Sequence, residues 1–236
     1  MIVLVFPFQG ELECFLGGAA PPGKKVRGLR VITTPSDPDW ILAVCGQGKV
    51  EAALACQILA DTYSPRAFFL LGSAAALDPT LKAGDAVLSD PCLEWDFRPD
   101  HGKDSVSPPR FNPGKPFPHA CDPKGSGDPK GNGVDGSWLR AGTVLSADRD
   151  VFDPGEKRRL REEFGALATA WEGAGFHRFL RRSGLPGWEI RIITETAEEG
   201  RISLADMRLR MLAAFPGLRK SIRAALRPEQ AQPVPG

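Results

Sequence analysis

The sequence lacks a long hydrophobic run and an excess charge of either sign. The longest apolar run, Ala67 to Leu77, is about half the ~20 residues that a transmembrane helix needs. The 30 Lys and Arg residues almost balance the 29 Asp and Glu residues, which leaves a formal net charge of +1. With so little excess positive charge, the overall composition does not favour binding to nucleic acid or to an anionic membrane. A small or neutral ligand fits the composition better.

Disulfide and metal-binding patterns are also missing. The cysteines are odd in number and none stand in a CxxC pair, so we expect reduced thiols and a cytoplasmic protein. The histidines share no spacing and have no acid-rich company, so we expect them on the surface or in loops and predict no metal site. These residues are Cys14, Cys45, Cys56, Cys92, Cys121, His101, His119 and His177.

Short runs rich in Val, Ile, Leu and Phe recur along the chain. Most are apolar on both faces, which is typical of a central sheet covered by helices. We expect strands at 2–6, 29–32, 40–45, 67–71, 85–88, 143–145 and 189–194. Helices are expected at 49–62, 154–164 and 169–182, followed by a C-terminal helix pair that begins near Ser203 and breaks near Pro216. Strands that alternate with helices predict an α/β fold.

The stretch at about 97–140 differs in composition from the rest of the chain. Pro, Gly, Lys and Asp dominate it, and β-branched residues are almost absent. Strand character resumes at Thr143. We therefore predict a flexible insertion within one domain that spans residues 1–236.

Basic residues gather in the last third of the chain. They fall at helical spacing, and acids elsewhere balance them, so a solvated helix face is a better interpretation than an RNA-binding surface. They are the run from Arg178 to Arg182 and Arg208, Arg210, Arg219, Lys220, Arg223 and Arg227.

Four short motifs follow one another between residues 46 and 90. Gly46-Gln-Gly-Lys49 joins a predicted strand to a predicted helix, where backbone N–H groups favour an anion or a polar ligand oxygen, although a tight turn needs glycine equally. The others are Gly72-Ser-Ala-Ala-Ala-Leu77, Thr80-Leu-Lys-Ala-Gly-Asp85 and Val87-Leu-Ser-Asp90. In this order and spacing they resemble the nucleosidase and purine/uridine phosphorylase superfamily, most nearly the methylthioadenosine/S-adenosylhomocysteine nucleosidases.

This resemblance implies a three-layer α/β/α fold of the nucleoside-phosphorylase type, with a central twisted mixed sheet. It also implies a homodimer that acts on a small-molecule nucleoside and needs no cofactor. The implied reaction is hydrolysis of the bond between C1′ of the ribose and a nitrogen of a purine base. Such a cleavage passes through an oxocarbenium-like state, which needs charge stabilisation near the sugar and a proton on the leaving base.

The resemblance also assigns roles to particular residues. Glu11, with Glu13 as its nearest competitor, occupies the place of the glutamate that positions and activates the attacking water. Arg191 and Ser73 are expected to help hold that water, and Glu172 is expected to bind the 2′ and 3′ hydroxyls of the ribose. The expected substrate-binding set is completed by Trp171, Val151, Asp150 and Gly72.

Two positions depart from the family pattern. Glu195 stands where the family has an aspartate that protonates the purine at N7, and its pKa must be raised if it is to act as a general acid. The extra methylene moves the acid by more than ~1 Å, and such a displacement can cost ~100-fold in rate unless the site is rebuilt. Asp150 stands where an aromatic residue commonly stacks on adenine, so Phe152 and Trp95 are candidates to replace that residue.

Water and phosphate are the two candidate nucleophiles. Phosphorylases of this superfamily carry an arginine just before the Gly-Ser pair. In this chain that pair is Gly72-Ser73, and Leu70 stands at the position of the arginine. The missing cation favours hydrolysis. The alternatives are a phosphorylase, a hydrolase for another nucleoside such as futalosine, and a nucleoside-binding homologue that has lost turnover.

Overall fold

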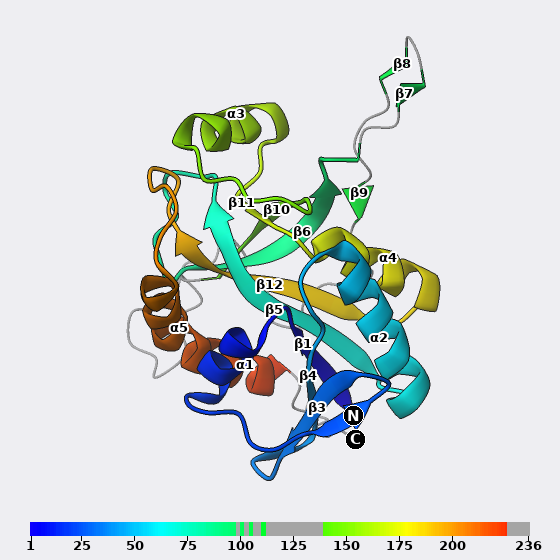
Figure 1. Ribbon diagram of the computed structural model, residues 1–236. Coiled ribbons are helices and arrows are strands. Elements are labelled where there is room, and N and C mark those ends of the chain that lie inside the picture. Colours follow the sequence, from blue (N-terminus) through cyan, green and yellow to red (C-terminus); the bar gives the residue numbers. More distant parts are fainter. Residues whose placement is uncertain (98–99, 102–103, 106–109, 112–138, 226–236) are drawn as a thin grey trace, which may run out of the picture.

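The computed structural model describes residues 1–97, 100–101, 104–105, 110–111 and 139–225 (Figure 1). Most of the insertion predicted at 97–140 therefore lies outside the described residues, as do Cys121 and His119. In the ranges that are described, no helix has the length and apolar character needed to cross a membrane.

Within those ranges, one mixed sheet of ten strands organises the fold. Its strands are β1 (Ile2–Phe6), β2 (Lys24–Val26), β3 (Leu29–Thr34), β4 (Asp37–Val44), β5 (Ala67–Ala76), β6 (Ala86–Glu94), β9 (Arg110–Phe111), β10 (Leu139–Ser146), β11 (Ala168–Ala170) and β12 (Gly187–Glu195). Two further short strands, β7 (Asp100–His101) and β8 (Asp104–Ser105), pair with each other. The helices are α1 (Gln9–Leu16), α2 (Lys49–Tyr63), α3 (Pro154–Phe164), α4 (Gly173–Ser183) and α5 (Leu204–Ala225).

The strand order is β11-β10-β6-β12-β5-β1-β4-β3-β2, with β9 beside β6. Because β11 also pairs with β5, strands β5, β12, β6, β10 and β11 form a closed ring, from which the other strands extend as an open sheet. Strands β4, β1, β5 and β12 are mutually parallel, whereas β6 runs antiparallel to β12. The prediction of a mixed sheet is confirmed.

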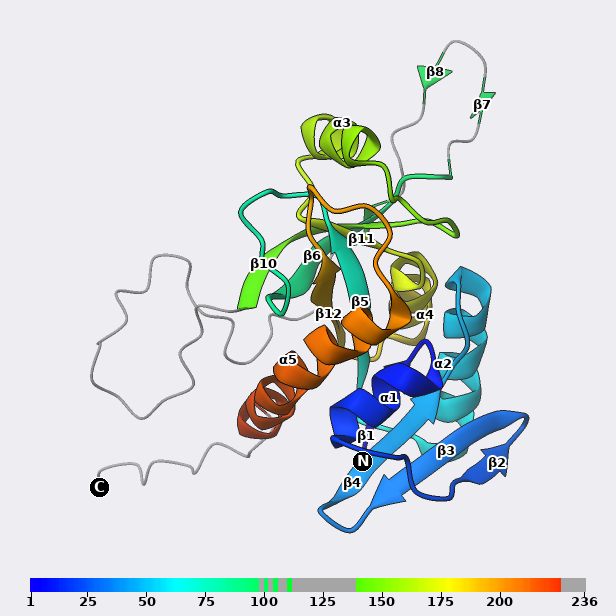
Figure 2. The same cartoon turned by 60° about the vertical axis from the view of Figure 1, so that its left-hand side comes forward.

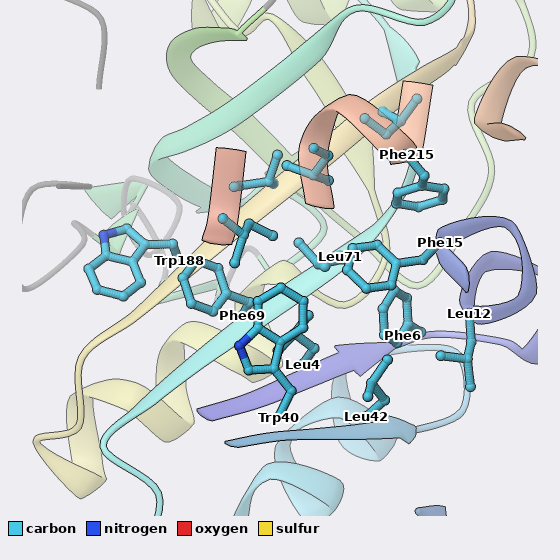
Figure 3. Packing of buried hydrophobic residues seen from close by; sticks show 14 of the residues in the cluster. Leu4, Phe6, Leu12, Phe15, Trp40, Leu42, Phe69, Leu71, Trp188 and Phe215 are labelled. Carbon is cyan, nitrogen blue, oxygen red and sulfur yellow. The ribbon is translucent and has the colours of Figure 1, made fainter. Parts of the chain in front are cut away.

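Helices cover both faces of the sheet, with α1 and α5 on one side and α2 and α4 on the other (Figures 1 and 2). Strand β1 shows how the sequence requires this, because its successive side chains point to opposite faces. Ile2, Leu4 and Phe6 join the core cluster beneath α1 and α5 (Figure 3), and Val3 and Val5 join the cluster beneath α2 and α4. The three-layer α/β/α prediction is confirmed.

Capping residues set the start of two helices as the sequence predicts. The Asp153 carboxylate accepts a hydrogen bond from the Glu156 backbone N–H at 2.7 Å, and α3 has the predicted bounds. The Ser203 hydroxyl accepts one from the Asp206 N–H at 3.1 Å at the start of α5. Short polar side chains in front of an apolar pattern are therefore reliable helix starts in this chain.

The predicted helix at 169–182 starts too early. Residues 168–170 form β11, and the helix occupies Gly173–Ser183. The reason is tertiary: β11 pairs with β10 on one side and with β5 on the other, so its backbone groups gain partners in the ring that a local helix would not supply. The sequence pattern does not predict helix α1, which carries Glu11, because eight residues show too little periodicity.

The predicted break near Pro216 is also wrong, since α5 continues through it as one helix. A proline inside a helix costs about 3 kcal/mol. Phe215, Leu218 and Ile222 are fully buried against the sheet, and burial of such side chains contributes about 1.5–3 kcal/mol each, enough to offset that cost.

Several basic residues of α5 are paired with acids, which corrects the expectation of a simple solvated face. Arg219 and Arg223 both bind the buried carboxylate of Asp37, and Arg210 binds Glu199. These pairs attach α5 to the β3–β4 turn and to the segment that follows β12. The four described cysteines are free, as expected, and all four are buried.

Glycine is required where α4 meets α2, and this gives a test of the packing. A Cβ on Gly175 would lie 1.8 Å from the Lys49 carbonyl oxygen, whereas a Cβ on Gly217 of α5 would meet nothing within 4 Å. We expect Gly175→Ala to lower the free energy of unfolding by about 3 kcal/mol through overpacking. Gly217→Ala is expected to raise it by about 0.5–1 kcal/mol through helix propensity. Urea denaturation of both variants measures the difference, and equal stabilities would contradict the close contact between α2 and α4.

Candidate active site

A cavity of about 270 Å³ opens beside the carboxyl-terminal halves of β5 and β12. Segments from distant parts of the chain line it, including the turn into α1, β5, the segment before α3, the start of α4 and the start of α5. Every predicted site residue except Gly72 is part of the lining: Glu11, Ser73, Asp150, Val151, Trp171, Glu172, Arg191 and Glu195.

Gly72 gives space to the two side chains beside it. It pairs with Arg191 in the parallel register of β5 and β12. A Cβ at Gly72 would lie 2.8 Å from Arg191 Nη1 and 3.1 Å from Glu11 Oε1. The glycine therefore allows a guanidinium and a carboxylate to approach the strand closely.

Glu11 is held in the first turn of α1 and is 1 % exposed. Its Oε1 accepts hydrogen bonds from the Ser73 backbone N–H at 2.6 Å and from the Ser73 hydroxyl at 2.8 Å. Its Oε2 is buried and has no hydrogen-bond partner among the described residues. The competitor Glu13 accepts a hydrogen bond from Gln9 instead and does not line the cavity.

Arg191 is the other buried centre of the site. Its Nη1 lies 3.0 Å from Glu172 Oε2, and its Nε donates to Glu189 Oε1 at 2.7 Å. Its Nη2 is buried without a hydrogen-bond partner in the part of the chain described. One guanidinium thus meets two carboxylates and keeps one N–H₂ group unbonded.

The glycine turn before α2 helps to place Glu172. Gly46 and Gly48 both have φ near +93°, which only glycine adopts readily. The Gly48 N–H donates to Glu172 Oε1 at 3.2 Å, and the Lys49 N–H donates to Asp148 at 2.9 Å. The amides predicted to bind a ligand anion therefore bind carboxylates of the protein itself.

Burial and charge give the carboxylates of the site different protonation behaviour. Burial, and then repulsion from Glu172, raise the pKa of Glu11 to about 8, against the hydrogen bonds of Ser73 and the charge of Arg191. Burial also opposes ionisation of Glu189, but Arg191 and His177 outweigh it and lower its pKa to about 2. At neutral pH the buried cluster combines an ionised Glu189 with a Glu11 that readily gains or loses a proton.

Glu195 also lines the cavity and is half-buried. Burial raises its pKa, although a hydrogen bond from the Ile202 N–H and the charge of Lys157 oppose this shift. Lys157 is itself fully buried and donates to the carbonyl groups of Thr196 and Glu199 at 2.9 and 2.7 Å. This lysine ties the segment that follows Glu195 to α3.

Of the aromatic residues considered for the site, two line the cavity and one does not. Trp171 and Phe152 line the cavity, and the Arg201 guanidinium lies 5.3 Å from the centre of the Phe152 ring. Trp95 packs in a separate core cluster and does not line the cavity. Of the two candidates for a stacking residue, Phe152 is the one at the cavity, next to Asp150.

The prediction that His177 lies in a loop or on the surface is wrong. It is 3 % exposed on α4, and its Nε2 lies 3.0 Å from Glu189 Oε2, so it donates to this ionised carboxylate. The Cys92 thiol is close to both, and these three ligand atoms lie within 4.8 Å of one another, as in a metal site. Arg191 already neutralises Glu189, and burial raises the pKa of the Cys92 thiol, so an ion-pair network accounts for the cluster.

The sequence patterns did not identify Glu189, His177 and Lys157 as residues that support the site. A signal for the first was present, because Glu189 and Arg191 alternate with isoleucines in a strand predicted to be buried. Charged residues two apart on one face of such a strand need partners in the core. Nothing in the sequence indicated that His177 or Lys157 would supply hydrogen bonds from a helix.

Comparisons with known proteins agree with this geometry. The model of the family described as the phosphorylase superfamily matches residues 2–209. The 5'-methylthioadenosine/S-adenosylhomocysteine nucleosidase of Treponema pallidum is 30% identical, with 97% of this chain and 98% of the relative covered. The solved structure of futalosine hydrolase from Helicobacter pylori strain 26695 superposes with a TM-score of 0.76 at 18% identity, over 94% of this chain and 97% of that one. A nucleosidase structure from S. pneumoniae gives 0.70 at 20% identity, over 96% and 98%.

These two solved structures show the fold, and the family match and the 30% identity show the descent. The motifs between residues 46 and 90 and the cluster around Arg191 lie within the matched range. The chain belongs to the phosphorylase superfamily.

Proposed function

We propose that this chain is a nucleosidase that hydrolyses the bond between ribose and base in a purine nucleoside. The observation that carries the proposal is the meeting of Glu11, Ser73, Glu172 and Arg191 around one cavity. Two of their buried atoms, Glu11 Oε2 and Arg191 Nη2, have no hydrogen-bond partner among the residues that the structure describes. The named relatives, a 5'-methylthioadenosine/S-adenosylhomocysteine nucleosidase and a futalosine hydrolase, support this class of substrate.

At the ribose end, Glu172 accepts hydrogen bonds from the 2′ and 3′ hydroxyls, while Glu11, Ser73 and Arg191 hold the attacking water. Glu11 takes a proton from this water when ionised, and its pKa of about 8 leaves about a tenth of it ionised at pH 7. A base with a pKa near the working pH is effective in proton transfer. Until it takes that proton, ionised Glu11 acts together with Glu172, and their negative charges stabilise positive charge that develops on the ribose ring.

At the base end, Glu195 protonates the leaving purine. Its raised pKa supports this role, because a general acid must hold its proton close to neutral pH. Phe152, held under Arg201, provides an apolar face for the base where the family's aromatic residue is replaced by Asp150.

Water is the nucleophile in this proposal. Leu70, at the position of the phosphorylase arginine, is fully buried in the core beneath α2 and α4. Arg191 already meets two carboxylates, which disfavours a phosphate dianion beside it. A nucleoside-binding homologue without turnover is the alternative that the two departures, Glu195 and Asp150, favour, and a phosphorylase is the other.

The chain also works as a homodimer in the cytoplasm in this proposal. Val50 and Leu54 on α2 are 67% and 54% exposed, and an apolar pair on a helix face is suited to contact with a second copy. Free, buried thiols at the four described cysteines fit a reducing compartment. The family resemblance also supports the homodimer.

The decisive measurement is release of free base from a panel of nucleosides with and without phosphate. Methylthioadenosine, S-adenosylhomocysteine, futalosine, adenosine and inosine form the panel. We expect base release from at least one of them in phosphate-free buffer. Release that requires phosphate would identify a phosphorylase, and tight binding without release in either buffer would identify a binding protein.

Glu172→Gln tests the ribose site. The amide keeps the shape of the side chain but loses the charge that strengthens hydrogen bonds to two hydroxyls, each worth about 1.5–3 kcal/mol. Calorimetry is expected to give at least ~100-fold weaker binding of the best panel nucleoside, with binding of the free base little changed. Glu162→Gln, an exposed acid on α3, serves as the control. Unchanged nucleoside affinity would remove Glu172 from the site.

Glu195→Asp tests whether the site is built for the longer acid. If Glu195 is the general acid, shortening it by one methylene withdraws the proton donor from the base, and kcat should fall about 100-fold. Glu195→Gln, which cannot donate the same proton, should lose at least as much. A faster Glu195→Asp variant would mean that glutamate at this position is itself the cause of weak turnover.

A further inference from the structure

Glu189 is a buried carboxylate that the proposed chemistry does not use. It is fully buried on β12, two residues before Arg191, so both side chains lie on the same face of the strand. An apolar residue would fill this position without the desolvation cost of a carboxylate. Its two hydrogen bonds, from Arg191 Nε at 2.7 Å and from His177 Nε2 at 3.0 Å, must therefore account for its presence.

Helix α4 holds the Arg191 guanidinium at two points, once directly and once through Glu189. Glu172, at the N-cap of the helix, contacts Nη1 directly. His177, in the second turn, contacts Glu189, which contacts Nε. The His177 ring is fixed in turn by Phe111, which stacks 6.5 Å away, and by the edge contact of Phe176. Both Nε and Nη1 are thereby occupied, and among the described residues Nη2 is left as the N–H₂ group that remains unbonded.

We propose that Glu189, held by His177, is a positioning residue that fixes the Arg191 guanidinium beside Glu11 and shares its positive charge. This inference rests on the proposed function of the same site. Geometry supports the positioning: without Glu189, Glu172 would be the one carboxylate among the described residues that still binds the guanidinium. The sharing of charge is supported by the number of carboxylates, because the single Arg191 guanidinium interacts electrostatically with Glu189, Glu172 and Glu11.

The charge sharing has a consequence that can be measured at Glu11 without any substrate. Removing the negative charge of Glu189 leaves more of the Arg191 charge to stabilise ionised Glu11, so the pKa of Glu11 should fall from about 8. The groups that bear on Glu11 are the hydroxyl and N–H of Ser73, the carboxylate of Glu172, the guanidinium of Arg191 and the nearby thiols of Cys14 and Cys45.

Glu189→Gln in the full chain is the test, read by carbon-13 NMR titration of the glutamate side chains and by kcat. Glu11→Gln identifies the Glu11 resonance by its disappearance. We expect Glu189→Gln to lower the Glu11 midpoint by ~0.5 pH unit or more and kcat by at least ~10-fold, because a guanidinium displaced by a fraction of an ångström holds the water poorly. An unchanged midpoint together with an unchanged kcat would overturn the proposal.

Two further comparisons separate positioning from a merely structural role. His177→Gln keeps an N–H donor for Glu189 and should retain most of the activity, whereas His177→Leu removes it and should behave like Glu189→Gln; equal behaviour of the two would count against the proposal. This pair also decides the matter if Glu189→Gln fails to fold. Asp37→Asn is the matched control, since Asp37 is another buried acid bound by two arginines, Arg219 and Arg223, away from the cavity. It should lower thermal stability but leave the Glu11 midpoint and kcat unchanged.

The two proposals fail in different ways. A wild-type chain that releases no base from any nucleoside contradicts the proposed function but leaves the titration of Glu11 intact as a measure of the Glu189 contact. If the wild-type chain hydrolyses a nucleoside, and Glu189→Gln changes neither the Glu11 midpoint nor kcat, the positioning role is contradicted. The proposed function then still stands.

Discussion

The site depends on one guanidinium that has been removed from water. Arg191 is 1 % exposed, and a buried charge of this kind is tolerated only with charged partners in good geometry. Glu172 and Glu189 supply two negative charges against its one positive charge. A third carboxylate, Glu11, is buried beside them, and burial followed by repulsion from Glu172 raises its pKa to about 8 against the charge of Arg191. The excess of carboxylates over cations in this buried cluster therefore favours a Glu11 that gains or loses a proton near neutral pH.

The fold brings these groups together through strand pairing rather than through nearness in sequence. Parallel pairing of β5 with β12 sets Gly72 opposite Arg191, and the absent side chain leaves room for the guanidinium. Closure of the ring by β11 then delivers Glu172 to the same edge, at the start of α4. A change in the register of either pairing would separate the charges, so the closed ring determines the chemistry as much as the side chains do.

The sequence predicted the residues of the cavity much better than it predicted what supports them. Glycine turns, helix caps and the motifs between residues 46 and 90 are local signals, and they indicated Ser73, which lines the cavity, and the turn before α2. The support comes from contacts across the fold, such as the bond from His177 to Glu189. Such a bond leaves no pattern in one sequence, because the two residues lie on different elements whose packing is set by the whole sheet. For the same reason, the local pattern predicts a helix where β11 lies.

The place of Glu195 in the cavity lining follows an irregularity in β12. Strict alternation along the strand continues the face of Glu189 and Arg191 to Glu195, but the pairing of β12 with β5 shifts register between Ile193 and Glu195. A bulge of this kind turns the following side chain to a new direction. Lys157 then fixes the next residues from α3, and its charge limits how far burial raises the pKa of Glu195. The register shift and Lys157 therefore contribute to the position of the Glu195 carboxyl group, which the length of the side chain alone does not determine.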